Sequence, residues 1–161
     1  MHILLLTSAY NSLCQRIHVE LLDLDYTITV VVWLSEKFIR DRINEAKPDI
    51  IICPMLKERI PEYIWQKYIC IIIHPGTIGD RGPSSLDWAI LNNLKEWGVT
   101  AIQAVEEFDS GPVWASVQFN MRTASKSKIY RREIADAAVK AVLECIEKLG
   151  KKNYVNLLPN S

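Results

Sequence analysis

The chain has 161 residues, 49% of them hydrophobic and 24% charged, which is typical of a globular protein and excludes a disordered or fibrous one. Basic and acidic residues number 19 each, and the zero net charge excludes a broad electrostatic attraction to nucleic acid or to an anionic membrane. No apolar run approaches the roughly 20 residues of a membrane-spanning helix, and the start of the chain lacks a signal-peptide pattern. We therefore expect one cytoplasmic domain.

Short apolar segments alternate with amphipathic ones through the first half of the chain. Strands are predicted at 2–7, 26–34, 50–53 and 68–73; helices are predicted after the first strand, after Ser35 as a possible N-cap, and over 61–67. Strands that are apolar on both faces and alternate with helices indicate an α/β fold, with a mostly parallel sheet covered on both sides. Ligands bind such sheets beyond the carboxyl ends of the strands.

His74 ends the fourth predicted strand and opens the segment that is richest in glycine and proline, 75–85. A helix is predicted over 85–94, and strands over 98–105 and 112–119. The turn between these strands, 108–111, is so short that they must be antiparallel, which makes an antiparallel edge to the sheet. A long helix is predicted over 128–148. We expect a domain over 1–150 and a polar tail, or the start of a linker, over 151–161.

The cysteines do not predict a metal site. Cys14, Cys53, Cys70 and Cys145 form no C-x-x-C pair, and the three scattered histidines complete no zinc pattern. Buried free thiols are the ordinary interpretation. Cys14 lies near the loop after the first strand, which leaves a reactive thiol open there.

Two residues are candidates for acid–base chemistry. His74 lies at the carboxyl end of a buried strand, and imidazole is the common side chain whose unperturbed pKa suits proton transfer near neutral pH. Asp109 lies in the turn between the last two predicted strands, where an aspartate is also an ordinary turn residue. A carboxylate within reach of a histidine can orient it.

The combined pattern is more specific than either residue. It consists of His74, the glycine–proline loop with Arg81-Gly82, Gly98-Val99-Thr100, and Asp109-Ser110-Gly111. This pattern resembles the folate-dependent formyltransferases over about residues 1 to 149. The resemblance implies a Rossmann-like formyltransferase fold and 10-formyltetrahydrofolate as the formyl donor. It also implies that His74 stabilises the tetrahedral intermediate and shuttles a proton, while Asp109 holds His74.

The chain departs from the family signature at two places. Ile72 stands where the family has an asparagine, and the loop after His74 is one residue shorter before Arg81. The asparagine donates a hydrogen bond to the oxyanion, and losing one such donor typically costs about 10²–10³ in rate. Either a backbone N–H replaces it, or the reaction needs less help, or the domain is not a catalyst. A thiol acceptor fits the second option, since a thiolate is already a strong nucleophile.

Longer segments resemble one branch, the HypX (HoxX) hydrogenase-maturation proteins. They are residues 8–13, 52–61, 74–90, 103–107 and 124–127. The resemblance implies transfer of the formyl group to coenzyme A. It also implies a crotonase-like carboxyl-terminal domain that releases carbon monoxide from formyl-CoA, for the nickel–iron hydrogenase active site. At 161 residues the chain is too short to hold that second domain.

Four residues are candidates for substrate binding. Gln15, at the start of the first helix, and Arg131, in the first turns of the last helix, are candidates for the phosphates of coenzyme A. Arg81 binds an anionic part of a substrate or pins its loop to a neighbouring aspartate. The strand end at Gln103 presents backbone groups to the pterin ring. Two other functions stay open: hydrolysis of formyltetrahydrofolate, and a non-catalytic folate-binding module.

Overall fold

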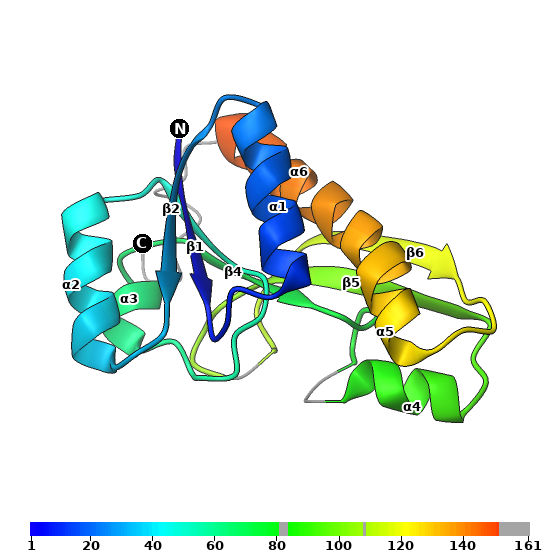
Figure 1. Cartoon of the computed structure of the whole chain (residues 1–161). Helices are drawn as coiled ribbons and strands as arrows, with labels where there is room; N and C mark the ends of the chain where they lie inside the picture. Colours follow the sequence, from blue (N-terminus) through cyan, green and yellow to red (C-terminus); the bar gives the residue numbers. More distant parts are fainter. Residues whose placement is uncertain (81–83, 108, 152–161) are drawn as a thin grey trace.

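A computed structural model describes residues 1–80, 84–107 and 109–151, in which strands and helices alternate (Figure 1). The strands are β1 (His2–Thr7), β2 (Thr27–Val32), β3 (Ile50–Cys53), β4 (Cys70–His74), β5 (Glu96–Gln103) and β6 (Val113–Asn120). The helices are α1 (Ser12–Asp23), α2 (Glu36–Ala46), α3 (Glu62–Trp65), α4 (Ser85–Leu91), α5 (Lys126–Ile129), the π-helical turn η1 (Tyr130–Ile134) and α6 (Ala135–Lys151).

The strands form one sheet in the order β2-β1-β3-β4-β5-β6. β1 pairs in parallel with β2 and β3, and β3 pairs in parallel with β4, whereas β5 runs antiparallel to both β4 and β6. The predicted α/β fold, with a mostly parallel sheet and an antiparallel edge, is confirmed. The chain changes direction across the sheet between β2 and β3, so the carboxyl ends of β1 and β3 flank the point where such sheets bind ligands.

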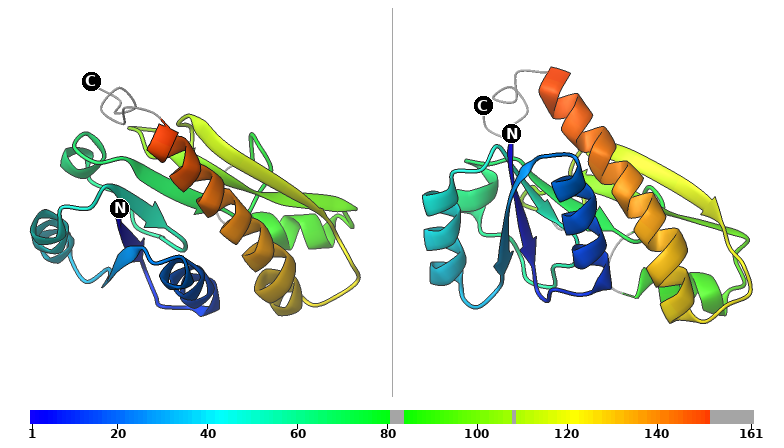
Figure 2. Two further views of the ribbon diagram at one scale, coloured as in Figure 1. Left: turned by 90° about the horizontal axis from the view of Figure 1, so that it is seen from above. Right: turned by 45° about the horizontal axis from the view of Figure 1, so that its top comes forward.

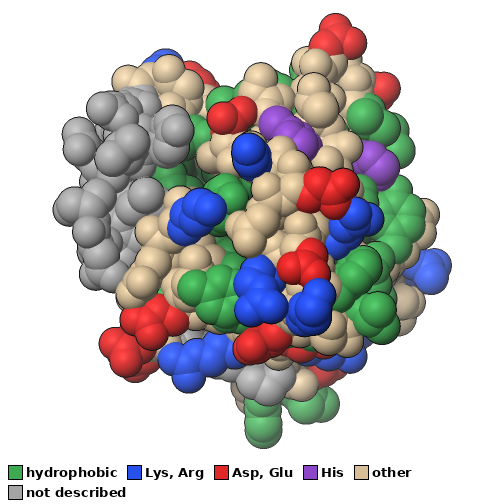
Figure 3. Space-filling view, turned by 90° about the vertical axis from the view of Figure 1, so that its left-hand side faces the viewer, with side chains coloured by type: hydrophobic (Ala, Val, Ile, Leu, Met, Phe, Trp, Pro, Cys, Tyr) green, Lys and Arg blue, Asp and Glu red, His purple; other side chains and the backbone are tan. Residues whose placement is uncertain are grey.

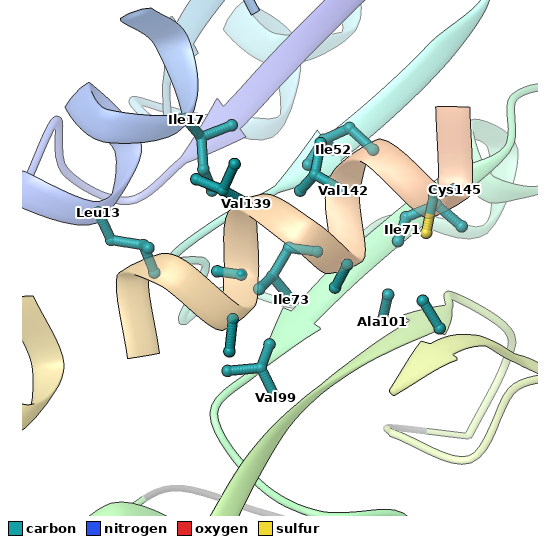
Figure 4. Close-up of a cluster of buried hydrophobic side chains, with 14 of the residues drawn as sticks. Leu13, Ile17, Ile52, Ile71, Ile73, Val99, Ala101, Val139, Val142 and Cys145 are labelled. Atoms are coloured by element: carbon teal, nitrogen blue, oxygen red, sulfur yellow. The ribbon is translucent and has the colours of Figure 1, made fainter. Parts of the chain in front are cut away.

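Helices cover both faces of the sheet, and the strand residues alternate between them (Figure 2). Ile3 and Leu5 of β1 belong to the core cluster that includes α1 and α6, whereas Leu4 and Leu6 belong to the cluster that includes α2 and α3. Figure 4 shows the first cluster, in which side chains from α1 and α6 meet those of the central strands. Burying a Leu or Ile side chain fully stabilises the fold by about 1.5–3 kcal/mol. Because both faces of these strands are apolar, helices are needed on both sides of the sheet to cover them.

Side-chain caps fix where several helices begin. Asn11 accepts a hydrogen bond from the Cys14 N–H at the start of α1, and Ser35 accepts one from the Phe38 N–H at the start of α2, as its sequence position predicts. The last helix begins at Lys126, two residues before its predicted start at Lys128, because the Ser125 hydroxyl caps it. It then contains η1, which the sequence did not predict.

Most predicted elements differ from the structure by one to three residues at an end, and two of these differences have a clear cause. α4 ends at Leu91 rather than Leu94, because Asn93 takes a left-handed φ of 52° and the Leu94 N–H bonds back to the Ala89 carbonyl. β5 begins at Glu96 rather than Gly98, because the ladder with β6 extends to Glu96. At the other end of the domain, α6 reaches Lys151, so the predicted tail starts inside its last turn. The other tail residues, 152–161, lie outside the described part.

Oppositely charged side chains lie close to one another on the surface. On the face shown in Figure 3, basic and acidic side chains are interspersed. On α2, Lys37 pairs with Asp41 at 2.7 Å, and Arg42 pairs with Glu45. Among the described residues, no helix is long and apolar enough to cross a membrane.

Candidate active site

His74 lies at the carboxyl end of β4, an interior strand of the sheet. The side chains of Cys70 and Ile72 lie in the cluster with α2 and α3, and because strand side chains alternate, His74 points to that same face. His74 is the last residue of β4, pairs in register with Thr100 of β5, and is only 5% exposed. The sheet therefore fixes the backbone of His74.

The structure brings Asp109 to His74 across 35 residues of sequence. The Asp109 Oδ2 lies 3.8 Å from the His74 Nδ1, and the Asp109 side chain is 3% exposed. This distance is too long for a hydrogen bond but places the carboxylate against the ring. Asp109 has a left-handed φ of 53°, a conformation that aspartate tolerates better than most residues.

Gly111 explains the spacing of the Asp-x-Gly motif. A Cβ atom on Gly111 would lie 1.8 Å from the Gln103 carbonyl oxygen and 2.9 Å from its carbon. The turn that carries Asp109 therefore packs directly on the backbone at the end of β5, which only glycine permits.

A second carboxylate, which the sequence analysis did not assign to His74, contacts the other ring nitrogen. The Asp80 Oδ2 lies 2.8 Å from the His74 Nε2, and the Asp80 side chain is 27% exposed. His74 thus lies between two carboxylates, one on each nitrogen. A signal for Asp80 was present in the sequence, since an aspartate six residues after a strand-ending histidine lies in the same glycine-rich loop.

Strand β5 anchors the loop that follows His74. The Thr100 hydroxyl donates to the Gly76 carbonyl at 2.7 Å, and the Trp97 indole N–H donates to the Pro75 carbonyl at 2.9 Å. Thr100 is the threonine of the Gly-x-Thr motif. The glycine of that motif, Gly98, would place a Cβ 2.8 Å from the Val117 carbonyl of β6. The motif therefore joins β6, β5 and the His74 loop.

A shallow pocket, partly open to solvent, adjoins Asp109. Its walls come from the segment after β3, from α3, from β4 and from the segment after β5. The lining residues are Leu56, Glu58, Arg59, Ile60, Trp65, Ile72, Ala104, Val105, Glu107 and Asp109. Ile72, which replaces the family asparagine, is part of the apolar wall of this pocket.

Ser8, at the end of β1, holds the loop that follows β3. Its hydroxyl accepts from the Lys57 N–H at 2.8 Å and donates to the Glu58 carboxylate, while its own N–H donates to the Met55 carbonyl at 2.7 Å. The pocket therefore lies beside the carboxyl ends of β1, β3 and β4, where parallel sheets bind ligands.

Gln103 does not direct its side chain at this pocket. It is 3% exposed, its Oε1 accepts from the Trp114 indole N–H at 2.9 Å, and its own N–H donates to the Pro112 carbonyl. Ala104 and Val105, which follow it, line the pocket instead. The predicted role of this strand end involved backbone groups, so the buried side chain of Gln103 is compatible with it.

The segments that carry Gln15 and Arg131 lie side by side. The Asn11 Nδ2 donates to the Tyr130 hydroxyl at 3.1 Å, and Arg16 pairs with Asp136 at 3.0 Å, which joins α1 to the last helix. Gln15 and Arg131 are exposed, and the Gln15 side chain donates to the Tyr10 carbonyl at 3.0 Å. Among the described residues, no hydrogen bond joins the Gln15 and Arg131 side chains.

The loop arginine Arg81 lies outside the described residues. The two aspartates near it in sequence have other partners, since Asp80 contacts His74 and Asp87 pairs with Lys126 at 2.7 Å.

All four cysteines are free and buried, and burial raises the pKa of the Cys14 thiol to about 11. A thiol that stays protonated near neutral pH is a poor nucleophile, which argues against a reactive Cys14. Within residues 1–80, 84–107 and 109–151, no group of three His, Cys, Asp or Glu side chains is placed to hold a metal ion.

Comparison with known proteins identifies the family. The protein family described as "Formyl transferase" matches residues 32–146, which is most of the chain. The chain belongs to the formyl transferase family.

Similar proteins include maturation factors of hydrogenases. The chain is 47% identical over 146 residues to the hydrogenase maturation factor HoxX of Bradyrhizobium diazoefficiens, covering 91% of this chain and 26% of that protein. It superposes on HypX of Aquifex aeolicus in complex with tetrahydrofolic acid with a TM-score of 0.91 and 43% identity, covering 94% of this chain and 27% of that one.

A more distant relative is a methionyl-tRNA formyltransferase of Borrelia turicatae, with 30% identity over 152 residues, 90% of this chain and 47% of that protein. The chain thus spans about a quarter of the length of the two hydrogenase-maturation relatives and about half of this one.

Proposed function

We propose that this chain transfers the formyl group of 10-formyltetrahydrofolate to coenzyme A and so forms formyl-CoA. The proposal extends to a crotonase-like domain of the same protein, which releases carbon monoxide from formyl-CoA for the maturation of a nickel–iron hydrogenase. A cytoplasmic location is part of the same proposal. The observation that carries it is the contact between the His74 Nδ1 and the Asp109 Oδ2, 3.8 Å apart, with Asp109 lining a pocket in a formyl transferase fold.

The folate half of the proposal rests on the pocket. Its apolar wall, formed in part by Ile72 and Ala104, suits the flat face of a pterin ring, while the backbone after β5 offers hydrogen-bonding groups to the ring edge. Asp109 lies between this pocket and His74, which suits proton transfer at the N10 atom that the formyl group leaves. HypX of Aquifex aeolicus, which is 43% identical to this chain, has a crystal structure in complex with tetrahydrofolic acid.

The acceptor half rests on Ile72. This aliphatic side chain offers no donor to the oxyanion where the family has an asparagine amide. A thiolate attacks a formyl carbon readily, so a thiol acceptor needs less stabilisation than an amine acceptor does. In this proposal His74 stabilises the tetrahedral intermediate, and Gln15, Arg81 and Arg131 are the candidates for the anionic groups of the acceptor.

A product assay tests the proposal. The protein is mixed with 10-formyltetrahydrofolate, with and without coenzyme A, and tetrahydrofolate and formyl-CoA are followed by mass spectrometry. We expect formyl-CoA only when coenzyme A is present, and none with the His74→Ala variant. Lys37→Ala, on the exposed face of α2, is the control and is expected to keep wild-type activity.

Two other outcomes would replace the proposal. Release of tetrahydrofolate without formyl-CoA, at the same rate with and without coenzyme A, would indicate a hydrolase. Folate binding without turnover, unaffected by His74→Ala, would indicate a non-catalytic folate-binding module.

A further inference from the structure

The segment that follows β4, residues 75–80, brings Asp80 back to His74. Gly79 takes a φ of +89°, and the Asp80 N–H donates to the Thr77 carbonyl at 3.0 Å, which turns the chain back toward the end of β4. The first part of the loop is fixed on β5 through the carbonyls of Pro75 and Gly76. The contact between Asp80 and His74 is thus supported from both sides.

The contact between Asp80 and His74 needs glycine at position 76. A Cβ atom on Gly76 would lie 2.5 Å from the Asp80 Oδ2 and 2.6 Å from the His74 Nε2, the two atoms that form the contact. Only glycine at this position lets the carboxylate reach the ring nitrogen. The part of the chain that departs from the formyltransferase signature, 75–80, is therefore the part that builds this contact.

The contact decides which ring nitrogen carries a proton. An ionised carboxylate only accepts hydrogen bonds, so a 2.8 Å contact requires a proton on the His74 Nε2. In the neutral ring, the Nδ1 that faces Asp109 then carries the lone pair. Without Asp80, the other tautomer, with the proton on Nδ1 and directed at Asp109, becomes available.

We infer that Asp80 is a positioning residue for the transfer: it fixes the tautomer and the orientation of His74, so that Nδ1 faces Asp109. The kinetic consequence rests on the proposed function, whereas the tautomer does not. Aspartates that hold a catalytic histidine in one tautomer contribute up to about 10⁴ in kcat.

The tautomer is tested directly by NMR of the protein labelled with ¹⁵N in its histidine rings. The chain has three histidines, so His74 is assigned by the signals lost in His74→Gln. In the neutral ring, we expect the proton of His74 on Nε2 in the wild type and a shift toward Nδ1 in Asp80→Ala. Asp80→Glu keeps an acceptor and is expected to restore the Nε2 proton.

The kinetic test separates positioning from substrate binding. Asp80 does not line the pocket, so Asp80→Ala is expected to lower kcat by about 10²–10⁴ while leaving the KM for the folate nearly unchanged. Asp41→Asn is the control, because Asp41 forms surface ion pairs with Lys37 and Arg40 on α2 and is expected to keep wild-type kinetics. Gly76→Ala, which displaces the carboxylate, is expected to lower kcat as Asp80→Ala does.

Three results would overturn the inference. They are an unprotonated Nε2 in the wild type, an unchanged tautomer in folded Asp80→Ala, and wild-type kcat in that variant. If the proposed function fails and no turnover is found, the NMR comparison still decides whether Asp80 fixes His74.

Discussion

Replacing Gly111 by alanine tests how closely the Asp109 turn depends on the backbone of β5. The new Cβ would lie 1.8 Å from the Gln103 carbonyl oxygen, whereas ordinary contacts begin at about 3.4 Å, so the turn must retreat by roughly 1.6 Å. The Gln103 carbonyl belongs to a hydrogen-bonded strand and cannot yield as a flexible side chain would. The gap between Asp109 and His74 is already 3.8 Å, so the retreat removes that contact.

The cost in stability follows from two effects. Overpacking a close contact costs about 1–3 kcal/mol, and the hydrogen bond from the Gln103 N–H to the Pro112 carbonyl, at 2.9 Å, lies beside the displaced residue. We expect Gly111→Ala to lower the free energy of unfolding by about 2–4 kcal/mol, measured by urea denaturation. Its formyl-transfer rate is expected to fall to that of Asp109→Ala.

Gly150→Ala is the matched control. Within the described part of the chain, no atom outside the backbone of α6 lies within 4 Å of a Cβ built on Gly150, so alanine there is expected to raise stability by about 0.5–1 kcal/mol. Wild-type stability and rate in Gly111→Ala would refute the close approach of this turn to β5.

Three further predictions concern the rest of the fold. Thr100→Val removes the donor to the buried Gly76 carbonyl and is expected to cost about 1–3 kcal/mol in urea denaturation; an unchanged midpoint would show that the loop is not anchored there. Asn11→Ala removes the cap of α1 and the contact with Tyr130, and is expected to cost about 0.5–2 kcal/mol, more than Ser35→Ala, which removes the cap of α2; equal costs would contradict the bridging role. Burial raises the pKa values of all four thiols, to about 11 for Cys14, so a thiol reagent at neutral pH is expected to label the unfolded chain and not the folded one. Because these folded-state pKa values are raised, their contribution to stability is present below pH 9 and is lost as the pH rises toward 11; a flat stability profile there would contradict it.

The sheet could be predicted from the sequence because its signals are local. Runs such as Ile50-Ile51-Ile52 are apolar on both faces, which only a covered strand allows, and the short turn before Pro112 required antiparallel strands. Boundaries were less predictable, because they depend on single contacts. The left-handed Asn93 shortens α4, and the pairing of Glu96 with Asn120 lengthens β5.

The site was predictable only in part. His74 and Asp109 were found through a family pattern, and only the fold shows that they meet. Asp80 contacts His74 because of a glycine turn and a close approach at Gly76, neither of which a spacing rule encodes. The buried position of the Gln103 side chain depends on Trp114, which lies on another strand. Long-range packing decides these features, and local sequence does not report it.

The central claim is that this site moves a formyl group from folate to a thiol. The most direct test is to supply 10-formyltetrahydrofolate labelled with ¹³C in the formyl carbon, together with coenzyme A, and to follow the label by NMR. The account predicts that the label moves from the N-formyl signal to a thioester signal in the wild type, and stays on the folate with His74→Ala. Label appearing only as formate, or remaining on the folate with the folded wild-type protein, would contradict it.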